Sequence, residues 1–188
     1  MSKNLLVYYS MDGNTRFLAA EIARNIPCDS VEIEPLNPLD RLGFLKYPVG
    51  GFMAIFQSTQ DIKQITQKVD DYDTILVGSP VWAGNVTPAV RTFLVRNPFR
   101  GKNVVIFGSY ADSPGSCGKQ MANLMNGNKV LAEHFWKKPL ENREKIATKM
   151  PQWLNAGELA GYFTPNATPQ EEPPEETVQE PEKGPDAF

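Results

Sequence analysis

The chain has 188 residues, a length that suits one well-buried domain and is short for two. Its net charge of −3 is uneven, because residues 164–188 carry −6 and the remainder carries +3. No basic stripe is interleaved with aromatic residues, which argues against a nucleic-acid partner. No run of about 18 apolar residues occurs and the N-terminus lacks a signal pattern, so we expect a cytoplasmic protein without a membrane span.

The chain has too few cysteine and histidine residues for a zinc protein or a disulfide-rich protein. Cys28 and Cys117 are the two cysteines and His134 is the single histidine, too few for a zinc set or a disulfide framework. We expect both cysteines to be free thiols in a reducing compartment. Cys117 has neither a pair of basic neighbours nor a histidine to activate it and is interpreted as inert. His134 is interpreted as structural.

Short apolar runs predict five β-strands, and amphipathic or polar stretches predict five α-helices. The predicted strands are residues 5–9, 31–34, 74–78, 104–108 and 129–136. The predicted helices are residues 15–25, 61–71, 87–94, 119–125 and 141–149, with Pro151 kinking or restarting the last. This alternation is typical of an α/β fold in three layers, with a doubly wound five-stranded parallel sheet of strand order 2-1-3-4-5.

Two segments stand apart from this pattern. Residues 164–188 are rich in proline and acids, which predicts a disordered acidic tail after a folded domain at 1–163. Residues Leu42–Phe56 are unusually apolar for a connection. They would pack on their own domain, contact a redox partner or a second copy in a homodimer, or touch a membrane surface. We expect part of this segment to approach the ligand crevice or a second subunit.

Three loops of unusual composition follow the first, third and fourth predicted strands. In an open parallel sheet, ligands bind beyond the carboxyl ends of the strands where the strand order reverses, so these loops should converge on one crevice. The first loop, Ser10–Thr15, leads into a helix whose first N–H groups lack partners and attract a phosphate. A capped helix start without a ligand is the alternative interpretation.

The residues of these loops resemble the motifs of the flavodoxin family, specifically short-chain flavodoxin-like FMN proteins, over about residues 3–160. The matching stretches are Tyr9-Ser10-Met11-Asp12-Gly13-Asn14-Thr15-Arg16, Gly78-Ser79-Pro80-Val81-Trp82-Ala83-Gly84-Asn85 and Gly108-Ser109-Tyr110-Ala111. By this resemblance, the first loop holds the FMN phosphate. The second borders the isoalloxazine ring, with Trp82 on or beside it, and Ser109–Gly118 closes the other side.

The resemblance and the residue chemistry together give a set of candidate cofactor-binding residues. They are Ser10, Met11, Asp12, Gly13, Asn14, Thr15, Pro80, Val81, Trp82, Ala83, Gly84, Asn85, Ser109, Tyr110, Ala111, Gly115 and Gly118. Trp82 and Tyr110 offer rigid stacking surfaces, with ordinary packing as the alternative for each. No catalytic side chain and no metal site is predicted.

Asp12 departs from the family pattern, which commonly has threonine at this position. A carboxylate cannot donate a hydrogen bond to a phosphate and repels it. Our hypothesis is that Asp12 points away from the phosphate and that Arg16 offsets part of its charge.

The sequence favours an FMN protein that transfers electrons between redox partner proteins or small-molecule donors and acceptors. An NAD(P)H- or quinone-dependent FMN oxidoreductase is the close alternative, and a ligand-free scaffold that recruits a partner through its acidic tail is the distant one. The sequence lacks the glycine motifs of a dinucleotide dehydrogenase and of a P-loop NTPase, and it lacks the acidic residues of a signalling receiver, so these classes are excluded. The mildly basic domain predicts a flavin potential less negative than in strongly acidic flavodoxins.

Overall fold

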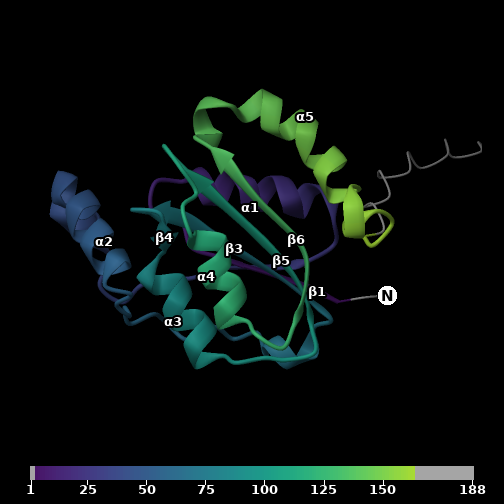
Figure 1. Cartoon of the computed structure of the whole chain (residues 1–188), viewed down its shortest axis with the longest axis horizontal. Helices are drawn as coiled ribbons and strands as arrows, with labels where there is room; N and C mark the ends of the chain where they lie inside the picture. Colours follow the sequence, from purple (N-terminus) through teal and green to yellow (C-terminus); the bar gives the residue numbers. More distant parts are fainter. Residues whose placement is uncertain (1–2, 164–188) are drawn as a thin grey trace, which may run out of the picture.

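The computed structural model describes residues 3–163, so the predicted acidic tail lies outside the described residues. A parallel sheet with strand order β2-β1-β3-β5-β6 forms the centre of the molecule (Figure 1). Its strands are β1 (Asn4–Tyr8), β2 (Asp29–Glu32), β3 (Thr74–Trp82), β5 (Asn103–Tyr110) and β6 (Lys129–Lys137). The two-residue β4 (Asn85–Val86) only folds back antiparallel on the end of β3. The predicted order is therefore confirmed, since β4 adds no crossover.

Helices cover both faces of the sheet, and alternate strand residues point to each face. Leu6, Leu76 and Val105 belong to the core beneath α1 (Asn14–Asn25) and α5 (Arg143–Leu154). Leu5, Ile75 and Val104 belong to the opposite core beneath α3 (Pro88–Arg96) and α4 (Cys117–Leu124). These strands are buried on both sides, which explains why their sequences are continuous apolar runs.

The connection from β2 to β3 differs from the prediction. A helix over residues 61–71 is wrong: Ile62 forms an isolated bridge with Pro35, and only Val69–Asp71 makes a short 3-10 turn. The amide of Leu36 donates to the carbonyl of Asp61 at 2.8 Å, so this backbone is paired in an extended form. Tertiary pairing here overrides the helical spacing of the apolar residues.

The helix of this connection is instead α2 (Lys46–Ile55), preceded by a 3-10 segment at Leu39–Leu45. It projects from one side of the molecule, at the left of Figure 1. Pro48 lies in its first turn, where a missing N–H does no harm, and Gly50 packs against Trp82. Among residues 3–163, no helix is long and apolar enough to cross a membrane.

Gly78 leaves the space that the fully buried ring of Phe107 occupies on the neighbouring strand, because a Cβ at Gly78 would collide with that ring. We expect Gly78→Ala to lower the free energy of unfolding by about 1–3 kcal/mol, since overpacking a core strains it. The double variant with Phe107→Leu should be more stable than the sum of the two single changes predicts, because leucine can withdraw from the new methyl. Urea unfolding of the four proteins measures this, and strict additivity would contradict it.

Candidate functional site

A cavity of about 440 Å³ opens at the carboxyl ends of β1, β3 and β5. All three predicted loops contribute to its wall, which confirms that they converge. From the predicted set, the lining residues are Ser10, Met11, Asp12, Asn14, Thr15, Pro80, Val81, Trp82, Ser109, Tyr110 and Ala111. The cavity therefore combines hydroxyl and amide groups at one side with aromatic and aliphatic surfaces at the other.

The polar side of the cavity is the start of α1. Gly13 precedes the helix with φ of 82°, a left-handed conformation that side chains disfavour, and its carbonyl accepts from the amide of Phe17 at 2.9 Å. The first-turn amides of α1 have no acceptor within the helix, and no acidic residue lies in that turn. These amides and the helix dipole favour an anion at this position.

A buried hydrogen bond joins two of the loops across the floor of the cavity. The hydroxyls of Thr15 and Ser109 lie 2.9 Å apart, and both side chains are buried. This contact fixes the end of β5 against the start of α1.

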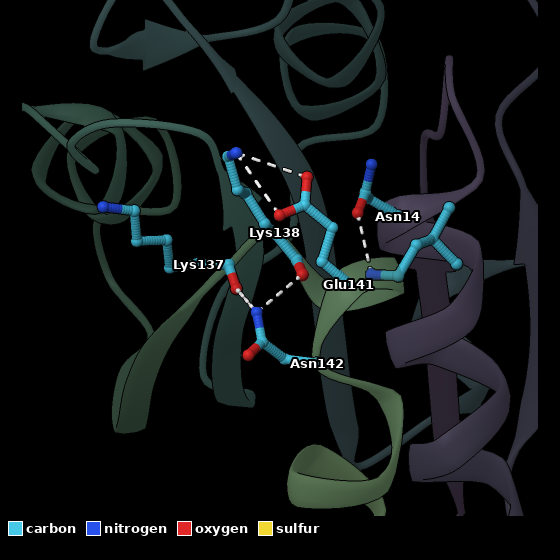
Figure 2. Close-up of polar contacts among 6 residues, drawn as sticks. Asn14, Lys137, Lys138, Glu141 and Asn142 are labelled. Carbon is cyan, nitrogen blue, oxygen red and sulfur yellow. Dashed lines mark hydrogen bonds and ion pairs between the residues drawn. The ribbon is translucent and has the colours of Figure 1, made fainter.

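A third wall comes from the segment after β6, which the sequence analysis did not include. The amide of Leu140 donates to the Asn14 side-chain oxygen at 3.1 Å, which turns the Asn14 –NH₂ group away from Leu140 (Figure 2). Lys138 has φ of 43°, a strained value for a residue with a side chain, and its amide donates to the Tyr110 carbonyl at 2.8 Å. Its ammonium pairs with Glu141 at 3.2 Å.

The charge of Asp12 is offset by a different residue from the one proposed. Lys46, the first residue of α2, lies 2.7 Å from the Asp12 carboxylate. Arg16 instead pairs with Glu32 through two nitrogens, each at 2.7 Å, so the part of the hypothesis that assigned Arg16 is wrong. Glu32 also accepts from the Tyr8 hydroxyl, and burial together with this carboxylate raises the pKa of Tyr8 to about 12. Asp12 nevertheless lies in the cavity wall.

Aromatic residues form the apolar side of the cavity. Trp82 is buried, and its ring and that of Tyr9 lie nearly perpendicular with 5.8 Å between centroids. Gly50 of α2 lies close to the six-membered ring of Trp82. Tyr47 of α2 and Tyr110 at the end of β5 also line the cavity. The prediction that part of Leu42–Phe56 approaches the crevice is borne out by Tyr47.

Six predicted residues do not line the cavity. Gly13 sets the backbone of the first loop, as described above. Gly84 and Gly115 touch each other backbone to backbone, and the amide of Ser116 donates to the Gly84 carbonyl at 2.8 Å. Asn85 accepts from Gln120 of α4, Ala83 occupies the exposed β3–β4 turn, and Gly118 packs in α4 against Glu133. These residues hold the loops together instead of facing the cavity.

Four lining residues were missed: Tyr47, Lys138, Leu140 and Glu141. The last three follow the carboxyl end of β6, so the rule that ligands bind at that edge of the sheet would have included them. For Tyr47, the sequence indicated only that some part of the apolar segment Leu42–Phe56 would approach the crevice, not which residue.

The remaining reactive side chains lie elsewhere. Cys117 is fully buried, and burial raises the pKa of its thiol to about 12, which leaves it protonated and unreactive near neutral pH. Cys28 is a second free thiol, with its pKa raised by burial to about 11. Among the residues the structure describes, no group of three metal-ligating side chains is present.

The sheet order and this cavity define a doubly wound α/β protein with a mononucleotide-sized site at its switch point. The sequence profile of the flavodoxin family matches residues 3–156, and the chain belongs to that family. FMN is the cofactor of flavodoxins, and the donor set fits it: amides, hydroxyls and the Asn14 amide for a phosphate, and Trp82, Tyr47 and Tyr110 beside a planar ring.

Solved structures support the fold. A candidate flavoprotein of Bacteroides uniformis ATCC 8492 is 21% identical, matching 82% of this chain and 99% of its own with a TM-score of 0.69. A flavoprotein of Lactobacillus acidophilus NCFM in complex with FMN is 20% identical over 76% of this chain and 98% of its own, with a TM-score of 0.60. A flavodoxin, WrbA-like protein of Agrobacterium tumefaciens is 16% identical over 87% of this chain and 100% of its own, with a TM-score of 0.58.

Replacing Asp12 by threonine removes a negative charge from the cavity wall and adds a hydroxyl donor. We expect Asp12→Thr to tighten FMN binding by about tenfold, because a carboxylate repels the phosphate even when it is paired. Quenching of flavin fluorescence on titration into apoprotein measures the change. The control is Asp112→Thr, which removes an exposed carboxylate outside the cavity. Weaker FMN binding by Asp12→Thr would show that the Asp12–Lys46 pair is needed to shape the loop.

Proposed function

We propose that this protein binds FMN in the cavity between α1, β3 and β5 and transfers electrons through it. The observation that carries the proposal is that one cavity of mononucleotide size contains both a helix start that favours an anion and three aromatic side chains, Tyr47, Trp82 and Tyr110. FMN supplies the ability to accept and release one or two electrons when bound. No general acid is needed for single-electron exchange, which agrees with a cavity whose two carboxylates, Asp12 and Glu141, are each paired with a lysine.

Each part of the cavity has a separate task in this proposal. The α1 amides and Asn14 hold the phosphate, and the Thr15–Ser109 bond keeps that position fixed relative to the end of β5. Trp82 and Tyr110 orient the ring and exclude water from its faces. Because these groups are already in place, little reorganisation is needed when the cofactor binds.

The charges around the cavity are self-neutralising. Asp12 pairs with Lys46, and Glu141 pairs with Lys138. A reduced, anionic flavin therefore faces no unpaired carboxylate from these residues. This supports our expectation of a potential less negative than in strongly acidic flavodoxins.

The proposal predicts one-to-one binding of FMN that depends on its phosphate. We expect riboflavin, which lacks the phosphate, to bind at least about a hundredfold more weakly, because it cannot use the charge-assisted bonds at α1. Flavin fluorescence and calorimetry on apoprotein measure both ligands. The FMN-loaded protein, once photoreduced, should then pass electrons to an added one-electron acceptor protein.

Failure to bind FMN would remove the proposal and favour the scaffold that recruits a partner through its acidic tail. Rapid oxidation of NADH or NADPH by the FMN-loaded protein would favour the alternative, an NAD(P)H- or quinone-dependent oxidoreductase. That alternative requires a second binding site beside the flavin.

We also propose that the exposed face of α2 packs against a second copy of this chain. This face consists of Leu45 and Phe56, which cap the two ends of α2, and of Val49 and Phe52 within it, at spacings of four, three and four residues. All four are exposed, Phe52 by 63% and Phe56 by 65%. This is the spacing of a helix–helix seam. The face has no charge of its own, since Lys46 is paired with Asp12, so two copies meet without repulsion. Tyr47 would place that interface at the edge of the cavity.

A charge on this face should prevent self-association. We expect the native protein to sediment as a dimer at micromolar concentration and Phe52→Lys/Phe56→Lys to sediment as a monomer, because the two like charges would face each other. Val95→Lys, at a residue of α3 that is 56% exposed, is the control and should remain dimeric. A native monomer, or a monomer that binds lipid vesicles through this face, would contradict the proposal.

A further inference from the structure

A second cavity, of about 660 Å³, lies between β6 and α5. It neighbours the cavity in which we propose that FMN binds, called the flavin cavity below. We call the second cavity the edge groove, because β6 is the last strand of the sheet in the described residues. Tyr110, at the end of β5, is part of the wall of both cavities. The two cavities are therefore neighbours on either side of Tyr110, and no other residue that lines the edge groove lines the first cavity.

Three aromatic rings form the wall of the edge groove. His134 and Trp136 are alternate residues of β6 and point to the same face, with ring centroids 4.3 Å apart. Trp153 of α5 meets Trp136 edge to face at 4.8 Å. Trp136 is almost fully buried, whereas Trp153 is half-buried and His134 exposed, so the last two offer ring surface to a ligand. Partial desolvation where its ring packs against Trp136, followed by the charge of Lys149, lowers the pKa of His134, which favours the neutral imidazole.

Three lysines surround these rings. Lys145 and Lys149 lie one turn apart on α5, and Lys137 extends from the end of β6, away from the Lys138–Glu141 pair (Figure 2). None of the three has a carboxylate partner in residues 3–163, although seven other cationic side chains there do. No described aspartate or glutamate lines the edge groove. Like charges one turn apart destabilise a helix slightly, so this arrangement favours an anion between them.

We infer that the edge groove binds a planar aromatic anion of the nucleoside phosphate class. The base would stack on Trp153 and His134, and the phosphates would lie among Lys137, Lys145 and Lys149. Ring and charge have to be recognised together, because the aromatic surface and the lysines line the same groove.

The shared wall at Tyr110 indicates what such a ligand would do. A dinucleotide with its phosphorylated half in the edge groove would have its second ring directed along Tyr110 toward the flavin cavity. This role rests on the proposed function and would narrow it to the oxidoreductase alternative, with a nicotinamide dinucleotide as the donor. Binding of a nucleotide to the groove does not depend on that role.

Calorimetric titration of the FMN-saturated full-length chain with ADP tests the site, because FMN blocks the other phosphate position. We expect Lys145→Gln/Lys149→Gln to weaken ADP binding by about tenfold or more at low salt, and added salt to weaken binding to the native protein. The matched control is Lys68→Gln/Lys119→Gln, two exposed lysines outside the groove, with less than about a twofold effect. Adenosine and inorganic phosphate, each lacking one half of the ligand, should bind far more weakly than ADP.

Absence of ADP binding, an equal effect of both lysine pairs, or equal binding of phosphate alone would overturn the inference. Trp153→Phe gives a second readout, since a smaller ring should weaken ADP but leave phosphate unchanged. If the chain does not bind FMN at all, the same titrations on apoprotein still separate the two sites. Only the groove variants would then change the response to ADP.

Discussion

The buried hydrogen bond between Thr15 and Ser109 joins residues 94 positions apart and fixes two walls of the crevice relative to each other. It holds the start of α1, where an anion is favoured, against the end of β5, where the aromatic wall begins. Parallel strands bring these two segments to one edge of the sheet, but the sheet alone does not fix the distance between them, because the connecting loops can move. The buried hydroxyl pair removes that freedom, because breaking it would leave two polar groups without water.

The two cavities beside Tyr110 follow from how the last strand of the sheet ends. After β6 the chain turns sharply at Lys138 and continues into α5, which covers the same face of the sheet as α1. One side of this turn closes the flavin cavity through Leu140, and the other opens the edge groove through Lys137. A strained backbone at Lys138 is tolerated because its amide and its carbonyl are both held, by Tyr110 and Asn142.

The sheet and most of the crevice could be predicted from sequence, because buried parallel strands appear as apolar runs and their loops carry the polar and glycine residues. The region between β2 and β3 could not. Ile62, Ile65 and Val69 have helical spacing, yet residue 62 pairs with Pro35 in an extended bridge. Pro48, Gly50 and Gly51 argue against a helix, yet α2 forms, with Gly50 packed against the ring of Trp82, where a larger residue would collide. Both errors have one cause: contacts with distant residues outweighed local preference.

The ion pair between Asp12 and Lys46 ties the loop that faces the anion to the first residue of α2. Thermodynamic linkage requires that the tie act in both directions. Whatever alters the free energy of this pair, whether an arriving dianion or a rise in ionic strength, also alters how firmly the helix is anchored. Conversely, a partner that binds and restrains α2 changes the affinity of the loop for its ligand, and the ligand changes the affinity for that partner by the same factor.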